Sequence, residues 1–179
     1  MRRVTLVVFA TLMTVASVAV LAQRRVTNPK PEPYLKQLFP EAVAFSPLEG
    51  TPLHFKAYAV DPTKNPGAKP IGYAFWTTDV TPKEYGYHGP IFFIVGLNLQ
   101  GRLTGAILDF DTEPYGYFSI QPKKFGAQFV GKSVRDPFRV GEDVDAVSSA
   151  SISVASATRA IRDGSRIMAR QFLNPADVK

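Results

Sequence analysis

The stretch that decides the fold is Ile91-Phe-Phe-Ile-Val-Gly-Leu97, followed by Asn98-Leu-Gln-Gly101 and the segment Leu103 to Phe110. The first run is apolar throughout, which is typical of a central strand. Asn98 to Gly101 has the composition of a hairpin turn, so Leu103 to Phe110 is predicted to return as the next strand. The core of the fold is therefore expected to be an antiparallel hairpin.

Further elements are predicted on both sides of this hairpin. Upstream, Leu53 to Ala59 and Ile71 to Thr77 have the patterns of strands, and Pro33 to Phe39 that of a short helix. Downstream, Lys123 to Phe129 fits a short helix, and Ser153 to Phe172 carries an apolar stripe at helical spacing. Sequential antiparallel strands followed by helices predict an α+β fold, with helices packed on an antiparallel sheet, rather than a doubly wound parallel one.

The composition excludes several kinds of site. The chain has no cysteine, which excludes disulfides, thiolate nucleophiles and cysteine-ligated clusters. Its two histidines, His54 and His88, have no metal-ligand spacing, so no metal site is predicted. No basic stripe with interleaved aromatic residues indicates nucleic-acid binding. Any redox chemistry would need an organic cofactor.

The N-terminal segment has the pattern of a membrane anchor. Arg2 and Arg3 precede the uncharged stretch from Val4 to Ala22, and Arg24 and Arg25 follow it. At about 1.5 Å per residue the stretch would extend about 28 Å as a helix, close to the thickness of a bilayer core. A signal peptide cleaved after Ala22 is the alternative. We expect an anchor in residues 1–25, a linker in residues 26–34, and a single domain in residues 35–174.

A hydroxyl-rich segment precedes the longest predicted helix. It reads Asp145-Ala-Val-Ser148-Ser149-Ala150-Ser151-Ile-Ser153 and places four hydroxyls and a carboxylate beside a helix start. Helix N-termini present unpaired amides that bind phosphate. One or two of these serines could simply cap the helix, whereas the whole set indicates a phosphate site.

In their order along the chain, several segments resemble the FMN-binding domain family, whose members include the periplasmic domain of the NosR regulator and flavin-carrying subunits of Rnf and sodium-pumping NADH:quinone reductase complexes. The resemblance covers roughly Leu35 to Phe172. Its segments are Leu38 to Phe45, Ile71 to Thr78, Gly86 to Ile91, Ile94 to Ala106, Thr112 to Pro114, Phe125 to Gly131 and Asp145 to Ser153.

The resemblance implies a flavin site in the last of these segments. The family motif there is Asp-x-x-Ser-Gly-Ala-Thr, and a flavin transferase links FMN from FAD to its threonine through a phosphoester. Carried over, the acidic position is Asp145, the first hydroxyl Ser148 and the alanine Ala150, while Ser149 replaces the glycine and Ser151 the acceptor threonine. Covalent FMN at Ser151, non-covalent flavin and no flavin remain alternatives, because a β-carbon at position 149 opposes a positive φ.

Other candidate site residues follow from the same resemblance. Ser153 lies on the first turn of the predicted helix, and Thr112 and Glu113 are expected to approach the flavin ring. His88 fits an exposed loop better than a catalytic base, and Trp76 fits the sheet core better than a flavin-stacking position.

These patterns support two readings of function. In the first, the protein is a membrane-anchored electron carrier with FMN, not a substrate-converting enzyme; its single-pass anchor lies in a bacterial inner membrane and its domain in the periplasm. Its partners would then be the lipid membrane, through Val4 to Ala22, other redox or membrane-complex subunits, and a flavin transferase. In the second, it is a flavin-free accessory subunit of a larger redox or photosynthetic membrane complex; a sensor or assembly role is a third possibility.

Overall fold

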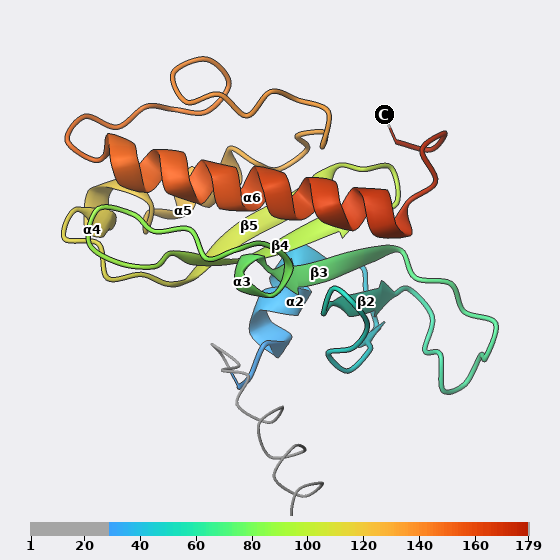
Figure 1. Cartoon of the computed structure of the whole chain (residues 1–179). Coiled ribbons are helices and arrows are strands. Elements are labelled where there is room, and N and C mark those ends of the chain that lie inside the picture. The colour runs from blue at the N-terminus through green and yellow to red at the C-terminus, as the bar shows by residue number, and fades with distance from the viewer. Residues whose placement is uncertain (1–28, 179) are drawn as a thin grey trace, which may run out of the picture.

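The computed structural model describes residues 29–178, which form three layers (Figure 1). The middle layer is a five-stranded antiparallel sheet in the order β1-β2-β3-β4-β5. Helices α5 (Lys123–Ala127) and α6 (Ser151–Phe172) cover one face, and α2 (Glu32–Leu38) covers the other. The predicted α+β class with an antiparallel sheet is confirmed.

The strands follow one another in space as they do along the chain. They are β1 (Ala44–Phe45), β2 (Phe55–Tyr58), β3 (Gly72–Trp76), β4 (Phe92–Asn98) and β5 (Leu103–Phe110). The hairpin of β4 and β5 has Ile94 opposite Ile107 and Gly96 opposite Gly105. Asn98 closes its turn, because its backbone N–H donates to Arg102 O and its side-chain oxygen accepts the N–H groups of Gln100 and Arg102.

Side-chain alternation along the central strands explains the two covered faces. Phe75, Phe93 and Val95 point to the α6 side, whereas Trp76 and Ile94 point to the α2 side. Both sets are almost fully buried, which accounts for the nearly continuous apolar sequence of these strands. Trp76 lies in the α2-side core beside Phe55, as predicted.

Helix α6 lies along the sheet with its apolar stripe facing inward. Val154, Ile161 and Met168 on this stripe are fully buried. Gly164 allows close packing, because a Cβ there would lie 2.9 Å from Cε2 of Phe75. The predicted helix is confirmed, with its start two residues earlier than expected, at Ser151.

Three short elements had no clear sequence signal: β1, α3 (Thr77–Val80) and α4 (Gly116–Ser119). The predicted strand at 71–77 therefore ends one residue early, and Thr77 begins α3 instead.

The predicted membrane segment, residues 4–22, lies outside the described residues. Among residues 29–178, no helix has the length and apolar character needed to cross a bilayer.

Candidate functional site

The hydroxyl-rich segment forms a tight turn that leads into α6. The N–H of Ala150 donates to the carbonyl of Val147, which closes the turn, and Ser149 within it has φ +64°. A positive φ at this place is the geometry for which turns usually select glycine. The backbone conformation that the family glycine would favour is therefore present here with a serine.

The first turn of α6 presents an exposed hydroxyl beside unpaired amides. Ser151 is exposed, and the N-cap residue Ala150 provides no side-chain hydrogen bond. No described residue accepts a hydrogen bond from the backbone N–H of Ser151, Ile152 or Ser153. Unpaired N–H groups and the positive end of the helix dipole together favour a phosphate at this position.

Glu113 joins the first turn of α6 to a loop from another part of the chain. One carboxylate oxygen accepts the N–H groups of His88 at 2.9 Å and Gly89 at 3.0 Å. The other accepts the N–H of Tyr87 at 2.8 Å and the hydroxyl of Ser153. Since Glu113 is only 6% exposed, its carboxylate is a buried anion held entirely by protein donors.

These hydrogen bonds determine the charge state of Glu113. Burial by itself raises the pKa of the carboxyl, but the Ser153 hydroxyl and the N–H groups of His88, Gly89 and Tyr87 outweigh it and lower the pKa below its ordinary value. Glu113 is therefore ionised at neutral pH. A fixed negative charge thus contacts Ser153, two residues after the exposed Ser151.

Close backbone approach makes this junction compact. A Cβ on Gly86 would lie 2.5 Å from Glu113 Cδ, and a Cβ on Gly89 would lie 2.0 Å from Thr112 Oγ1. A side chain at either position would therefore force Glu113 or Thr112 to shift. Thr112 is exposed and contacts the loop of residues 86–89, whereas Glu113 points into it.

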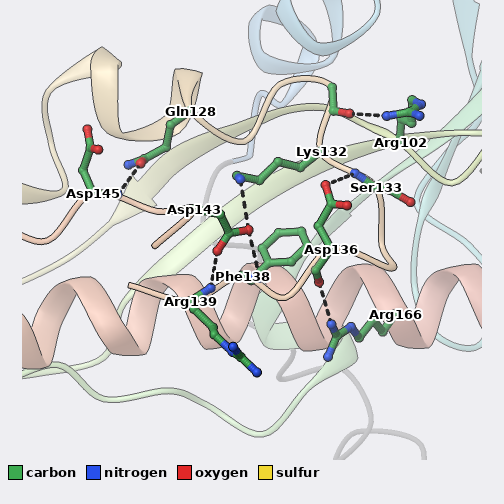
Figure 2. A network of polar contacts seen from close by, with 11 residues as sticks. Arg102, Gln128, Lys132, Ser133, Asp136, Phe138, Arg139, Asp143, Asp145 and Arg166 are labelled. Carbon is green, nitrogen blue, oxygen red and sulfur yellow. Dashed lines mark hydrogen bonds and ion pairs between the residues drawn. The ribbon is translucent and has the colours of Figure 1, made fainter. Parts of the chain in front are cut away.

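The segment before the turn is held by a polar network (Figure 2). Asp143 accepts the N–H groups of Phe138 and Arg139 and lies 3.2 Å from Lys132 Nζ. Arg166 of α6 donates to the carbonyl oxygens of Val134 and Asp136. The loop of residues 132–143 is thereby held by hydrogen bonds within the loop and by hydrogen bonds from α6.

Asp145 is tied to this framework through its backbone. Its N–H donates to Oε1 of Gln128 at 2.8 Å, while its side chain is exposed (Figure 2). The carboxylate thus remains accessible to solvent, three residues before Ser148. Gln128 follows α5, so the position of the segment before the Ser149 turn depends on where α5 packs.

Aromatic side chains are exposed around the same end of α6. Tyr87 is 67% exposed, Tyr115 46%, Tyr117 68% and Ile152 53%. Tyr87 and Tyr115 adjoin the Glu113 junction, Tyr117 lies on α4, which contacts α6, and Ile152 follows Ser151. Exposed apolar surface of this kind often marks a binding site. We call Tyr87, Tyr115 and Tyr117 the aromatic rim, with the apolar Ile152 beside them.

The structure groups the predicted site residues into two sets. Ser148, Ser149, Ala150 and Ser151 form the turn and the helix start, whereas Thr112, Glu113 and Ser153 form the junction beside it. Asp145 lies at the edge of the first set. His88 contributes its backbone N–H to the junction, and its ring is exposed.

Sequence reasoning missed Gln128, the backbone donors of residues 87–89 and the aromatic rim. The partners of Gln128 and of the backbone donors lie at least 17 residues away along the chain, so local patterns do not indicate these contacts. The sequence held one signal of these contacts, because Ser153 and Ser156 lie one turn apart on α6. Ser153 donates to the Glu113 carboxylate, and Ser156 donates to the carbonyl oxygen of Tyr85.

Comparison with known proteins agrees with this geometry. Residues 86–165 match the family model described as FMN-binding domain, and this match spans the loop of residues 86–89, the Glu113 junction, the turn and most of α6. No curated protein matches the chain. The predicted resemblance to this family is confirmed over these residues, and FMN is the cofactor that the match supports.

The described residues fit this cofactor. Bound FMN would supply one- and two-electron redox chemistry. The exposed Ser151 hydroxyl and the adjacent amides can hold its phosphate, and the aromatic rim offers apolar surface for its ring.

Proposed function

We propose that this protein is an electron carrier in which FMN is attached to Ser151 through a phosphoester. The observation that supports it best is the positive φ of Ser149, which aligns the turn so that an exposed Ser151 hydroxyl adjoins unpaired helix amides. The family match supports the flavin. The protein positions the cofactor and provides the electrostatic environment around it, while the cofactor carries the electrons.

Attachment would be a phosphoryl transfer carried out by a separate flavin transferase. Ser151 Oγ attacks the phosphorus on the FMN side of FAD, the bond to the bridging oxygen breaks, and AMP leaves. The serine proton passes to a base of the transferase or to water. On this chain, the amides at the start of α6 would neutralise part of the phosphate charge.

The experiment that tests attachment is intact-mass measurement after co-expression with a flavin transferase. We expect a mass increase of one FMN and in-gel flavin fluorescence, both abolished by Ser151→Ala. Ser148→Ala is the matched control, because it removes a neighbouring exposed hydroxyl from the same turn and should leave attachment intact.

A colourless wild-type protein of unmodified mass would contradict the proposal. It would favour the second candidate, a flavin-free accessory subunit of a membrane complex. The observation behind that candidate is the Cβ that Ser149 carries in a backbone region that side chains disfavour. Flavin that fluoresces in solution but is lost on denaturation would indicate non-covalent binding instead.

We further propose that residues 4–22 anchor the domain on the periplasmic side of a bacterial inner membrane. The support is the uncharged length of this segment and the arginine pairs at its ends. Membrane fractionation combined with the intact mass of the purified protein tests it. Recovery in the soluble fraction, with the mass of a chain that begins at Gln23, would show cleavage.

A further inference from the structure

A groove runs beside the edge strand β5, and its lining residues are distant in sequence from Ser151. Its volume is about 460 Å³, within the range of ligand sites in proteins. Residues 104–108 of β5 form its floor, α2 forms one wall, and α5 forms the other. The two walls come from opposite faces of the sheet (Figure 1).

The groove exists because the edge of β5 is covered only in part. At its start, Leu103 exchanges backbone hydrogen bonds with Lys132 and Gly131. Beyond that point, residues 104–108 have no strand on their outer side in the described part of the chain, and α5 approaches them at Gly126. An open sheet edge between two helices leaves a trough rather than a flat surface.

The lining has the chemistry of a site for an amphiphile. Leu38, Ile107, Leu108 and Ile120 provide apolar surface. Gln37 and Lys123 add hydrogen-bond donors, and none of the described lining residues is acidic. Lys123 is exposed and makes no ion pair with a described residue. Its charge is therefore available to an anion in the groove.

We propose that this groove binds one alkyl chain of an amphiphile with an anionic head, which Lys123 holds while the chain lies along β5. A free fatty acid and the acyl chain of an anionic membrane lipid share this chemistry. Membrane lipid would be close to the groove, because α2 begins ten residues after the segment 4–22 that we expect in the membrane. The proposal does not depend on flavin.

The absence of cysteine in the chain allows a site-specific test. A cysteine placed by Val130→Cys, at the exposed rim of the groove, is labelled with an environment-sensitive fluorophore. Val60→Cys is the matched control, because Val60 is similarly exposed, at 52% against 58%, and does not line the groove. Both are made in the full-length chain with Ser151→Ala, so that no flavin is attached, and reconstituted in phosphatidylcholine vesicles.

Laurate, dodecylammonium and dodecanol are then titrated. We expect a saturable response to laurate from the Val130→Cys label and none from the Val60→Cys label. Dodecanol and dodecylammonium should bind at least about tenfold more weakly, the scale of one charge-assisted hydrogen bond. Adding Lys123→Gln should lower laurate affinity about tenfold and remove its advantage over dodecanol, and Ala127→Phe should abolish binding by filling the groove.

Vesicles containing phosphatidylglycerol distinguish the two sources. A response at Val130→Cys without added laurate identifies a membrane lipid as the ligand, whereas a response to laurate alone identifies a free fatty acid. Equal responses to the three amphiphiles, an unsaturable response, or unchanged binding in both groove variants would overturn the proposal. Ala59→Phe, an exposed site outside the groove, and circular dichroism of each variant exclude loss of folding as the cause.

Discussion

At the scale of single residues, Ser149 connects backbone geometry to function. It has a positive φ in a turn whose next residues are the helix N-cap and the candidate acceptor Ser151. A side chain in this region costs about 1–2 kcal/mol relative to the right-handed region. The turn persists because Ala150 is buried and bonded to Val147, so the surrounding structure compensates for the strain.

Replacing this serine should therefore relax the turn. We expect Ser149→Gly to raise the free energy of unfolding by about 0.5–1 kcal/mol, since relief of strain exceeds the added entropy of the unfolded chain. The same change should increase the fraction of protein that carries FMN. Urea denaturation and intact mass measure the two effects. Ser148→Gly is the control, since Ser148 does not have a positive φ, and it should lower stability.

At the scale of elements, the position of the site depends on helix α5 and strand β5. Gly126 brings α5 against the backbone of β5, because a Cβ there would lie 2.1 Å from the carbonyl oxygen of Ala106. Gln128, just beyond α5, holds Asp145 before the turn that leads into α6. One wall of the groove also comes from α5. Close packing of these two elements therefore supports both candidate sites.

A methyl group at this contact should force the elements apart. We expect Gly126→Ala to lower the free energy of unfolding by about 1–3 kcal/mol, despite the better helix propensity of alanine. Thermal unfolding measures it. Gly67→Ala is the matched control, because its Cβ would meet no atom closer than 3.4 Å. Equal stability of Gly126→Ala and wild type would show that α5 does not need this close approach.

At the scale of the whole molecule, Glu113 joins parts of the chain that are far apart in sequence. Its carboxylate receives donors from the loop of residues 87–89 and from the first turn of α6. Because these bonds lower its pKa, the ionised form stabilises the folded state. This contribution is present above the unfolded pKa of about 4.5 and is lost as pH falls through the lower folded pKa.

The pH dependence of folding should show this contribution. At pH 7 we expect Glu113→Gln to be about 1–3 kcal/mol less stable than wild type, because backbone donors lose a charged acceptor. The difference should shrink as pH falls below about 4.5, since only wild type then loses an ionised group at this position. Urea denaturation across pH checks it, with the exposed Glu41→Gln as control. A constant difference across pH would contradict the role of the charge.

The sequence by itself determined the layered α+β fold and the resemblance to the FMN-binding domain family. Apolar runs such as Ile91 to Leu97 and the helical stripe after Ser153 report burial directly, because solvent exclusion depends on local side-chain periodicity. The β5 boundaries agree for the same reason. The resemblance also indicated FMN as the cofactor, which the family match over residues 86–165 supports.

Only the tertiary structure decided the conformation and surroundings of the Ser149 turn that leads into α6. The positive φ of Ser149, the burial of Glu113 as an ionised carboxylate and the support from Gln128 each depend on residues distant in the chain. The same is true of the groove, which needs two helices from opposite faces of the sheet. Serine alone disfavours a positive φ, and the packing around it supplies the energy that local propensity lacks.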